Sequence, residues 1–379
     1  MTQKKTTIAS TAELKKYNYL QVYCAIYQAG QTTRQEIARA LGLSLPTVSQ
    51  NLQELTDNGL IQRTGHLAST GGRRPYSIQP VSTARISVGL EILKEMAHIV
   101  VIDLYGSILF EDFFLLNFHN TTTYLDALCK WTNETVHHLP YPDESVLGIG
   151  IAVQGLLSDD GSVLEFGKLL ESGIHTEDFS QRLDWKCAMV HDVDLAARTE
   201  LWFHQDLVDA VYLSLNRNLG SSLITNGTIH VGNESYSSTI EHMCLIPGGK
   251  KCYCGKSGCV ETCCSADALR EAAGQPLEQF FFRLRSGFET EKEIWHTYLH
   301  HLAMTIDNIH MIIHGPILIG GLLQTYMIPE DFELLTKLVN DMTFFQTKSI
   351  RIEQSKCENK ATAIGAGLFY IERFLQTLE

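Results

Sequence analysis

The N-terminal part of the chain contains three short segments in which apolar residues recur with the period of an α-helix. Leu20, Tyr23 and Tyr27 follow one another at spacings of three and four residues, which predicts a first helix. Thr33-Arg-Gln-Glu36 has the sequence of a capping box, in which the two end residues each bond the other's backbone N–H. A second helix is therefore expected from this box to Leu41.

A third helix is predicted to begin at Ser44. Serine is a favoured N-cap, and Pro46 is tolerated in a first helical turn. Val48, Leu52 and Leu55 then share one face, at spacings of four and three residues. Two short helices joined by a tight turn are typical of a helix-turn-helix, whose second helix enters the major groove of DNA.

The third helix carries polar side chains that can meet DNA. Gln50 and Asn51 can bond adenine edges, and Thr47 can reach a phosphate or a thymine methyl. The residues of this helix expected to contact DNA are Ser44, Pro46, Thr47, Ser49, Gln50 and Asn51. The alternative is that the three helices form a protein-docking module.

Two strand-like segments, 60–63 and 76–78, flank a stretch rich in glycine and arginine. This arrangement predicts a winged helix-turn-helix, with Arg63 on the first strand and Gly72, Arg73 and Arg74 on the wing. Paired arginines on a glycine-rich turn suit a narrow minor groove, where the potential is most negative. The alternative is that these arginines belong to a solvated loop.

From residue 86 onward, strand-like segments alternate with helical ones. The strand-like segments are 86–92, 98–103, 146–153, 188–190, 210–215, 221–225 and 228–230, and the clearest helical ones are 194–202 and 292–313. Strand hairpins followed by helices occur twice along this part of the chain. The pattern predicts an α/β body made of two similar lobes.

Charge separates the two parts of the chain. A length of 379 residues exceeds what one core usually covers, so two or three compact units are expected. The net charge is −13, yet residues 1–80 hold nine Lys/Arg against four Asp/Glu, a balance of +5 that leaves −18 for the remainder. An acidic body repels nucleic acid, so only the basic N-terminal part is a candidate for DNA contact.

No membrane or secretory segment is evident. No window approaches the roughly 18 uninterrupted apolar residues of a spanning helix. The run from Met1 to Thr7 lacks the apolar core of a secretory signal, and ten cysteines with clustered spacing suit a reducing compartment. A cytoplasmic location without membrane contact is therefore expected.

Candidate chemistry concentrates between residues 242 and 261. His242, Cys252, Cys254 and Cys259 supply one imidazole and three thiolates, a set that tetrahedral zinc accepts. Since the protein fills all four positions, the pattern indicates a structural zinc rather than a catalytic one. The alternatives are that these are ordinary buried cysteines, or that a ligand is replaced by Cys244, Cys263 or Cys264.

The same stretch resembles the signature of the ROK family, which groups sugar-responsive repressors and sugar kinases. The resemblance rests on Glu241-His242, on Gly248-Gly-Lys-Lys-Cys-Tyr-Cys-Gly255 and on Gly258-Cys-Val-Glu-Thr262, and extends less specifically from about Ile86 to Leu368. It implies zinc on the histidine and three cysteines, and an actin-like, ribonuclease-H-like body with a cleft between its lobes. A winged head is then expected at 1–82 and the body at 83–379, with its lobes divided near residue 195.

Kinases of this family bind phosphate with an Asp-x-Gly-Gly-Thr run after the first strand and with a second glycine-rich loop. The corresponding runs here are Glu91-Ile-Leu-Lys-Glu95 and Asn216-Arg-Asn-Leu-Gly220. The bulk of Leu93 and the charge of Glu95 oppose phosphate binding. The resemblance therefore implies a body that no longer uses ATP and is not an enzyme. The family's final strand and glycine pair are expected at 316–321.

The resemblance also implies that the sugar side of the cleft is retained. Asp192 stands where the family's kinases keep a general base, and without ATP it would accept hydrogen bonds from a sugar. Thr239 replaces a carboxylate that normally grips two sugar hydroxyls, and the alternative for Asp192 is a cap of the helix predicted from Asp194. The residues expected to bind a sugar effector are Gly155, His191, Asp192, Thr239, His242 and Glu261.

Together these features predict a sequence-specific DNA-binding transcriptional regulator, a repressor of sugar-utilisation genes with a non-catalytic sugar cleft and a structural zinc. Because one recognition helix reads only a few base pairs, the protein is expected to bind a palindromic double-stranded operator as a homodimer or a tetramer. Two alternatives stay open. One is a sugar kinase with an appended head, and the other is a regulator that answers to a protein partner or to zinc supply.

Overall fold

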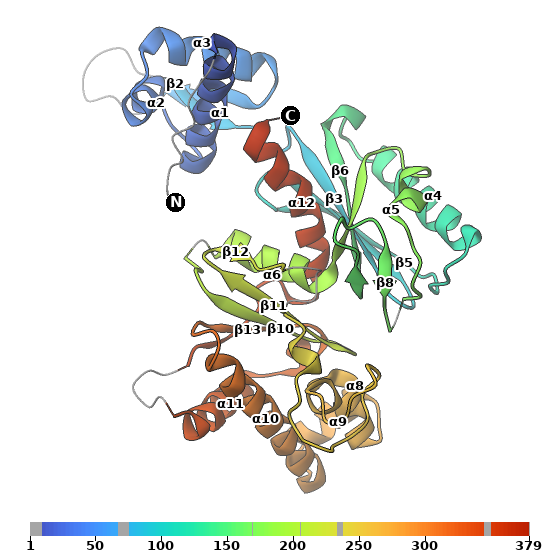
Figure 1. Ribbon diagram of the computed structural model, residues 1–379. Helices are drawn as coiled ribbons and strands as arrows, with labels where there is room; N and C mark the ends of the chain where they lie inside the picture. The colour runs from blue at the N-terminus through green and yellow to red at the C-terminus, as the bar shows by residue number, and fades with distance from the viewer. Residues whose placement is uncertain are drawn as a thin grey trace.

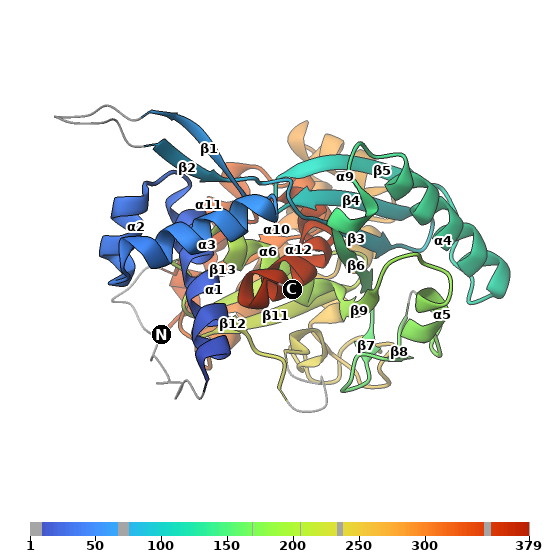
Figure 2. The same ribbon diagram turned by 90° about the horizontal axis from the view of Figure 1, so that it is seen from above.

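The computed structural model describes residues 10–66, 76–168, 170–204, 206–232, 238–344 and 350–378. Figures 1 and 2 show a small N-terminal head beside a larger body with two sheets. The predicted wing residues Gly72, Arg73 and Arg74 lie outside the described residues. Among the helices that are described, none combines the length and the apolar run needed to cross a bilayer.

The head contains the three predicted helices and the two predicted strands. These are α1 (Thr11–Ala29), α2 (Arg34–Leu41), α3 (Leu45–Asp57), β1 (Ile61–His66) and β2 (Tyr76–Pro80), with β1 and β2 paired antiparallel. The capping box at Thr33 and Glu36 is present, and Ser44 caps α3 by accepting the N–H of Thr47. The first helix begins earlier than its apolar pattern indicated, because Ser10 and Glu13 form a further capping box.

The body is built on two five-stranded sheets, one in each lobe. The first lobe has the order β5-β4-β3-β6-β9 and the second has β12-β11-β10-β13-β14. In the first lobe the strands are β3 (Ile86–Ile92), β4 (Ala97–Asp103), β5 (Ile108–Phe114), β6 (Val146–Val153) and β9 (Cys187–His191). In the second lobe they are β10 (Ala210–Leu215), β11 (Leu219–Thr225), β12 (Thr228–Ile229), β13 (Ile317–Gly320) and β14 (Ile352–Gln354). A short hairpin of β7 (Leu156–Leu157) and β8 (Leu164–Phe166) extends from the first sheet.

Helices cover these sheets and fill the space between them. The α-helices are α4 (Thr122–His137), α5 (Thr176–Ser180), α6 (Asp192–Phe203), α7 (Glu261–Cys264), α8 (Ala266–Ala273), α9 (Leu277–Arg285), α10 (Glu289–His310), α11 (Pro329–Met342) and α12 (Ala361–Thr377). Short 3-10 turns are η1 (Asp143–Ser145), η2 (Ile240–His242), η3 (Leu322–Tyr326) and η4 (Glu358–Lys360). Figure 1 shows α6 and α12 between the two lobes.

Two of the sequence predictions need correction. The strand at β13 is not the last, since β14 pairs parallel to its outer side. This edge strand was missed because it is short and carries the polar residues Glu353 and Gln354. The helix predicted from Asp194 begins at Asp192 instead. The boundaries proposed at residues 82 and 195 stay predictions.

Glycines allow α12 to lie directly on the first sheet and on α6. A Cβ on Gly89 of β3 would come within 1.8 Å of the carbonyl oxygen of Ala363, and one on Gly150 of β6 within 2.0 Å of that of Ala366. On α12 itself, a Cβ on Gly365 would lie 1.9 Å from the carbonyl oxygen of Leu195. Since real Cβ atoms do not come this close, these three glycines fix a tight joint between the sheet and the two inter-lobe helices.

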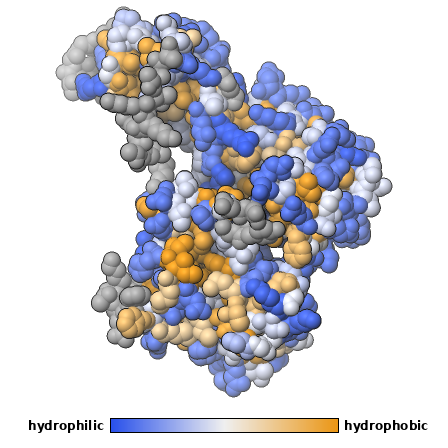
Figure 3. All heavy atoms as spheres, viewed as in Figure 1, coloured by the Kyte–Doolittle hydropathy of each residue, from blue (hydrophilic) through white to orange (hydrophobic). Residues whose placement is uncertain are grey.

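The surface differs between the parts of the molecule. On the face seen in Figure 3, hydrophilic residues cover much of the first lobe, and hydrophobic residues gather mainly on the second lobe. The buried side chains of the two lobes form separate cores, one on each sheet.

Candidate functional site

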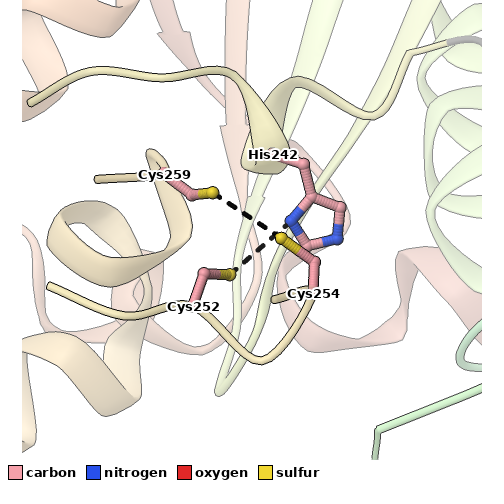
Figure 4. A group of neighbouring side chains, drawn as sticks. All are labelled: His242, Cys252, Cys254 and Cys259. Atoms are coloured by element: carbon pink, nitrogen blue, oxygen red, sulfur yellow. Dashed lines mark hydrogen bonds between the residues drawn. The ribbon is translucent and has the colours of Figure 1, made fainter. Parts of the chain in front are cut away.

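The four predicted metal ligands come together at one point (Figure 4). The donor atoms of His242, Cys252, Cys254 and Cys259 all lie within 4.8 Å of one another. The sulfur of Cys252 is 3.8 Å from Nδ1 of His242, and the sulfurs of Cys254 and Cys259 are 3.7 Å apart. Zinc–sulfur bonds of about 2.3 Å in a tetrahedron place neighbouring sulfurs about 3.8 Å apart, so the spacing fits the ion.

The loop that carries the cysteines is held in shape by its own backbone. Gly255 and Gly258 have φ values of 91° and 75°, in the left-handed region that glycine adopts most easily. A Cβ on Gly258 would also meet the carbonyl oxygen of Ile246 at 1.7 Å. Within the described residues, the group of donor atoms close enough to share an ion does not include the candidate replacement ligands Cys244, Cys263 and Cys264. The sulfurs of Cys263 and Cys264 lie instead beside the hydroxyls of Thr262 and Thr305.

A small cavity of about 80 Å³, lined by both polar and apolar atoms, adjoins the cluster. Five of the six residues predicted to bind an effector line it: Gly155, His191, Asp192, Thr239 and His242. Glu261 does not line the cavity. Its carboxylate accepts the backbone N–H of Leu219 at 2.7 Å and lies 3.7 Å from Nζ of Lys168, so it is turned inward to support the neighbouring loop.

His191 is the electrostatic centre of the cavity. Its two ring nitrogens lie 3.4 Å from a carboxylate oxygen of Asp194 and 3.5 Å from one of Asp192. Burial works against the charged imidazolium, but these carboxylates and that of Glu241 outweigh it and raise the pKa of His191 to about 9. Burial raises the pKa of Asp192 to about 6. The cavity thus holds a positive ring surrounded by carboxyl groups.

Glu241 is a cavity residue that the sequence prediction missed. The motif of the family has a glutamate at the position of Thr239 and a glycine at that of Glu241, and here the carboxylate stands two residues later. Its side chain lines the same cavity, where burial raises its pKa to about 7, and it accepts a hydrogen bond from the hydroxyl of Ser221 at 3.2 Å. The departure of the sequence from glycine at this position was the signal that could have identified it.

Residues from both lobes close the mouth of the cavity. Lys168, just after β8, bonds the side-chain oxygen of Asn218 at 2.7 Å, and its ammonium lies 4.7 Å from the ring centre of Tyr253. The ring of Phe166 also stacks with that of Tyr253, with centroids 6.4 Å apart. These contacts cross from the first lobe to the second, so the side chains at the mouth of the cavity tie the two lobes together.

A larger cavity of about 310 Å³ lies on the other side of the cleft and shares Gln154, Ser214 and Asn216 with the first. Its wall contains the two runs that correspond to phosphate loops. Arg217 donates two hydrogen bonds to Glu95, at 2.9 and 3.1 Å, and so joins these runs across the cleft. Both side chains are half exposed, so the pair adds little stability, but it links the two runs.

The recognition helix presents most of the predicted DNA-contacting residues. Ser44, Pro46 and Gln50 are exposed, Thr47 and Ser49 are half-buried, and Arg63 on β1 is exposed. A residue that the prediction missed, Arg34 of α2, donates to the hydroxyl of Ser49 at 3.0 Å. It therefore brings a positive charge to the outer face of the recognition helix.

Asn51 must be removed from the set of exposed residues. It is only 4% exposed, and its side-chain amide donates to the carbonyl of Thr47 at 2.8 Å. The reason is helical geometry, because Asn51 follows Val48 by three residues and precedes Leu55 by four, on the face that packs into the head.

Comparison with known sequence families gives two matches. A family described as "ROK family" matches residues 87–373. A family described as "Winged helix-turn-helix DNA-binding" matches residues 20–62. Together the two matches cover the head and the body.

Known relatives are similar at low identity. The "DNA-binding transcriptional dual regulator NagC" of Escherichia coli (strain K12) is 27% identical over 270 residues, which cover 70% of this chain and 66% of that protein. This chain therefore spans just under two thirds of the length of that relative. The "Xylose repressor" of Caldicellulosiruptor bescii is 23% identical over 377 residues, covering 93% of this chain and 94% of the relative.

Solved structures share the fold. A ROK family transcriptional regulator described as a homolog of the E. coli MLC protein has a TM-score of 0.77 at 19% identity and covers 96% of both chains. A ROK hexokinase from Thermus thermophilus has a TM-score of 0.64 at 18% identity and covers 76% of this chain and 99% of its own. The regulator thus aligns with nearly the whole chain, whereas the kinase leaves about a quarter of it unmatched.

Proposed function

Since this chain belongs to the ROK family, we propose that it is a DNA-binding transcriptional repressor whose body senses a sugar. The observation that carries the proposal is the combination of a winged helix-turn-helix with a body whose two phosphate runs are joined by Glu95 and Arg217. A head of this kind binds duplex DNA, and a closed phosphate site leaves the sugar cavity as the place for a regulatory ligand. Relatives of this chain include an "N-acetylglucosamine repressor" and a "Xylose repressor", and these descriptions support the same role.

In this proposal the ligand is a sugar or a sugar derivative. Asp192 and Glu241 would accept its hydroxyl groups, and Gly155, His191 and Thr239 would line the rest of the site. Because the described cavity is small and covered by Lys168, ligand binding would favour a different arrangement of the two lobes. Such a difference in affinity between arrangements is what a sugar needs to change DNA binding.

We further propose that His242, Cys252, Cys254 and Cys259 hold a structural zinc ion. Three thiols and an imidazole at these distances suit it, and four protein ligands leave no position for catalysis. The ion would cross-link the loop that carries His242 to the cysteine loop. Since Glu241 precedes this histidine, the metal would also fix the carboxylate that faces the cavity.

DNA would be read by the N-terminal part of α3, with Gln50 directed at base edges and Ser44, Pro46, Thr47 and Ser49 near the backbone. The wing arginines Arg73 and Arg74 with Gly72, and Arg63 on β1, would contact the minor groove and phosphates. Two-fold symmetry would supply a second half-site, so a homodimer in the cytoplasm, or a pair of dimers, would bind a palindromic operator.

The direct test uses the full chain on duplexes that it selects from a random pool. Titration of the complex with pentoses, hexoses, amino sugars and their phosphates is expected to reveal at least one compound that changes DNA affinity by about tenfold. Fluorescence anisotropy of a labelled duplex measures the change. If no compound alters the affinity, the sugar-sensing role is wrong, and a protein partner or zinc supply becomes the remaining signal.

The substitution Glu241→Gln is the matched test of the cavity. It keeps the size of the side chain but removes the carboxylate charge, so the active compound is expected to bind with about tenfold lower affinity while DNA binding without it is unchanged. The control is Glu271→Gln, an exposed glutamate paired with Lys250 outside the cavity. Equal ligand affinity in the two variants would place the ligand elsewhere.

The kinase neighbours favour a second candidate function, a sugar kinase with an appended head. We expect no ADP release above background with any sugar of the same panel, because Glu95 repels phosphate and the glycine-rich run is absent. A coupled ADP-release assay measures this, with a hexokinase as positive control. Sugar-dependent turnover would refute the proposed loss of activity.

A further inference from the structure

The head is attached to the body by an interlock of two tyrosines. The rings of Tyr27 on α1 and Tyr105 in the turn after β4 stack with centroids 4.4 Å apart and planes at 5°. The hydroxyl of Tyr27 donates to the carbonyl of Leu104 at 2.6 Å, and that of Tyr105 donates to the carbonyl of Tyr27 at 3.0 Å. Each ring thus bonds the other side's backbone, so the head cannot rotate at this point unless both bonds break.

The C-terminal end of α6 holds this turn from the body side. The indole N–H of Trp202 donates to the carbonyl of Tyr105 at 2.9 Å. The turn fits closely against it, because a Cβ on Gly106 would lie 3.0 Å from the indole nitrogen and 3.2 Å from the ring of Phe203. Trp202 also packs on the core that the head shares with α12.

The N-terminal end of the same helix forms one wall of the ligand cavity. His191 precedes α6 and Asp192 opens it. Asp194, in the first turn of the same helix, accepts a hydrogen bond from the hydroxyl of Ser222 of the second lobe at 2.7 Å. Twelve residues of helix span about 18 Å. A single rigid element therefore runs from the cavity to the base of the head.

We propose that Trp202, Tyr105 and Tyr27 are positioning residues that couple the cavity to the orientation of the DNA-binding head. A shift of α6 at its cavity end moves Trp202 at the other end, and Trp202 carries the Tyr105 turn and the stacked Tyr27 with it. The head follows as a unit, because Tyr23 and Ile26 on the same helix are fully buried in a core that includes residues of α2 and α3. This inference rests on the proposed ligand role of the cavity.

The α12 helix gives the competing route. It lies along α6, and the thiol of Cys24 on α1 is 3.9 Å from the carbonyl of Leu375 near its end. The polar part of this contact is a single weak sulfur interaction, and the rest is apolar packing in the core that the head shares with α12. The tyrosine interlock instead has two directional hydrogen bonds and a stacked pair. A variant that removes contacts of the α6 route alone can therefore separate the two routes.

The test is a double-mutant cycle read by amide hydrogen exchange in the full chain, with no ligand needed. His191→Asn removes the ring that pairs with Asp194 at the start of α6. It is expected to change exchange in the second half of α1, residues 22–29, by about fivefold in the parent protein. In a Trp202→Phe background, which loses the indole bond but keeps an aromatic ring, the change is expected to fall below about twofold.

Trp185→Phe is the matched control. The indole of Trp185 also donates to a backbone carbonyl, that of Asp143 at 3.2 Å, but this bond lies within the first lobe and does not involve the head. In the Trp185→Phe background the fivefold change in exchange is expected to persist.

If Trp202→Phe impairs folding, Tyr105→Phe is the substitute variant, because it removes one hydrogen bond of the interlock and keeps the ring stack. Equal changes in all backgrounds, or no change in the parent, would overturn the coupling. A failed sugar titration would not affect this result, so the two proposals can fail separately.

Discussion

Replacing Cys254 by serine is expected to release the metal and to lower the free energy of unfolding by about 4 kcal/mol. The parent chain is expected to contain about one zinc per chain, because its three thiols and one imidazole complete a tetrahedral shell. A serine hydroxyl is a poor zinc ligand and leaves the cluster with three donors. Metal content by atomic emission and denaturant unfolding measure the two effects.

The control for this experiment is Cys244→Ser. Cys244 is exposed and pairs with Cys259 through the backbone, so its sulfur stands beside the cluster without joining it. This variant is expected to keep its zinc and its stability. A parent protein that is metal-free after purification without chelators, yet as stable as the zinc-treated sample, would contradict the proposed metal site.

The elements of the head could be predicted because their signals are local. The capping box at Thr33 and the serine cap at Ser44 act within three residues, and the apolar spacing from Val48 to Leu55 acts within two turns. The assignment of Asn51 to DNA was wrong, because it considered the chemistry of the side chain and left out its position on the helix. An amide that suits adenine was assigned to DNA although its spacing from Val48 and Leu55 places it on the buried face.

The grouping of the four candidate metal ligands could also be predicted, since all of them lie within one stretch of 18 residues and a glycine-rich loop can fold them together. The cavity beside it was predicted only in part. His191 and Asp192 were identified through a family motif, but Lys168 and Tyr253 meet only because the two lobes pack against each other. The spacing of residues along the chain gives no indication of that contact.

The contacts of the charged side chains also could not be predicted from the sequence. Glu261 was expected to face a sugar, but the N–H of Leu219, 42 residues away, turns its carboxylate inward. The pairing of Glu95 with Arg217 spans 122 residues and depends on the cleft being closed. The sequence indicated that both phosphate runs had changed, whereas only the structure shows that the two changes face each other.

Replacing Gln50 by alanine is expected to weaken binding to the selected operator by about 2 kcal/mol, or roughly thirtyfold. Gln50 is exposed in the N-terminal half of α3, the part of a recognition helix that meets base edges. A side-chain amide that bonds an adenine supplies this energy only on the correct base, so binding to random duplexes is expected to be unchanged. Anisotropy titrations at one fixed salt concentration, on both kinds of duplex, measure the difference.

Gln53→Ala is the matched control on the same helix. Gln53 is also exposed, but it lies nearly one turn further from the helix start, and its amide donates to Asp57 at 2.8 Å. Its loss is expected to leave operator affinity within about twofold of the parent value, since phosphate contacts and the N-terminal half of α3 are retained. If both variants bind the operator as the parent does, α3 does not read bases. If both lose affinity on random duplexes as well, the helix contributes only non-specific binding.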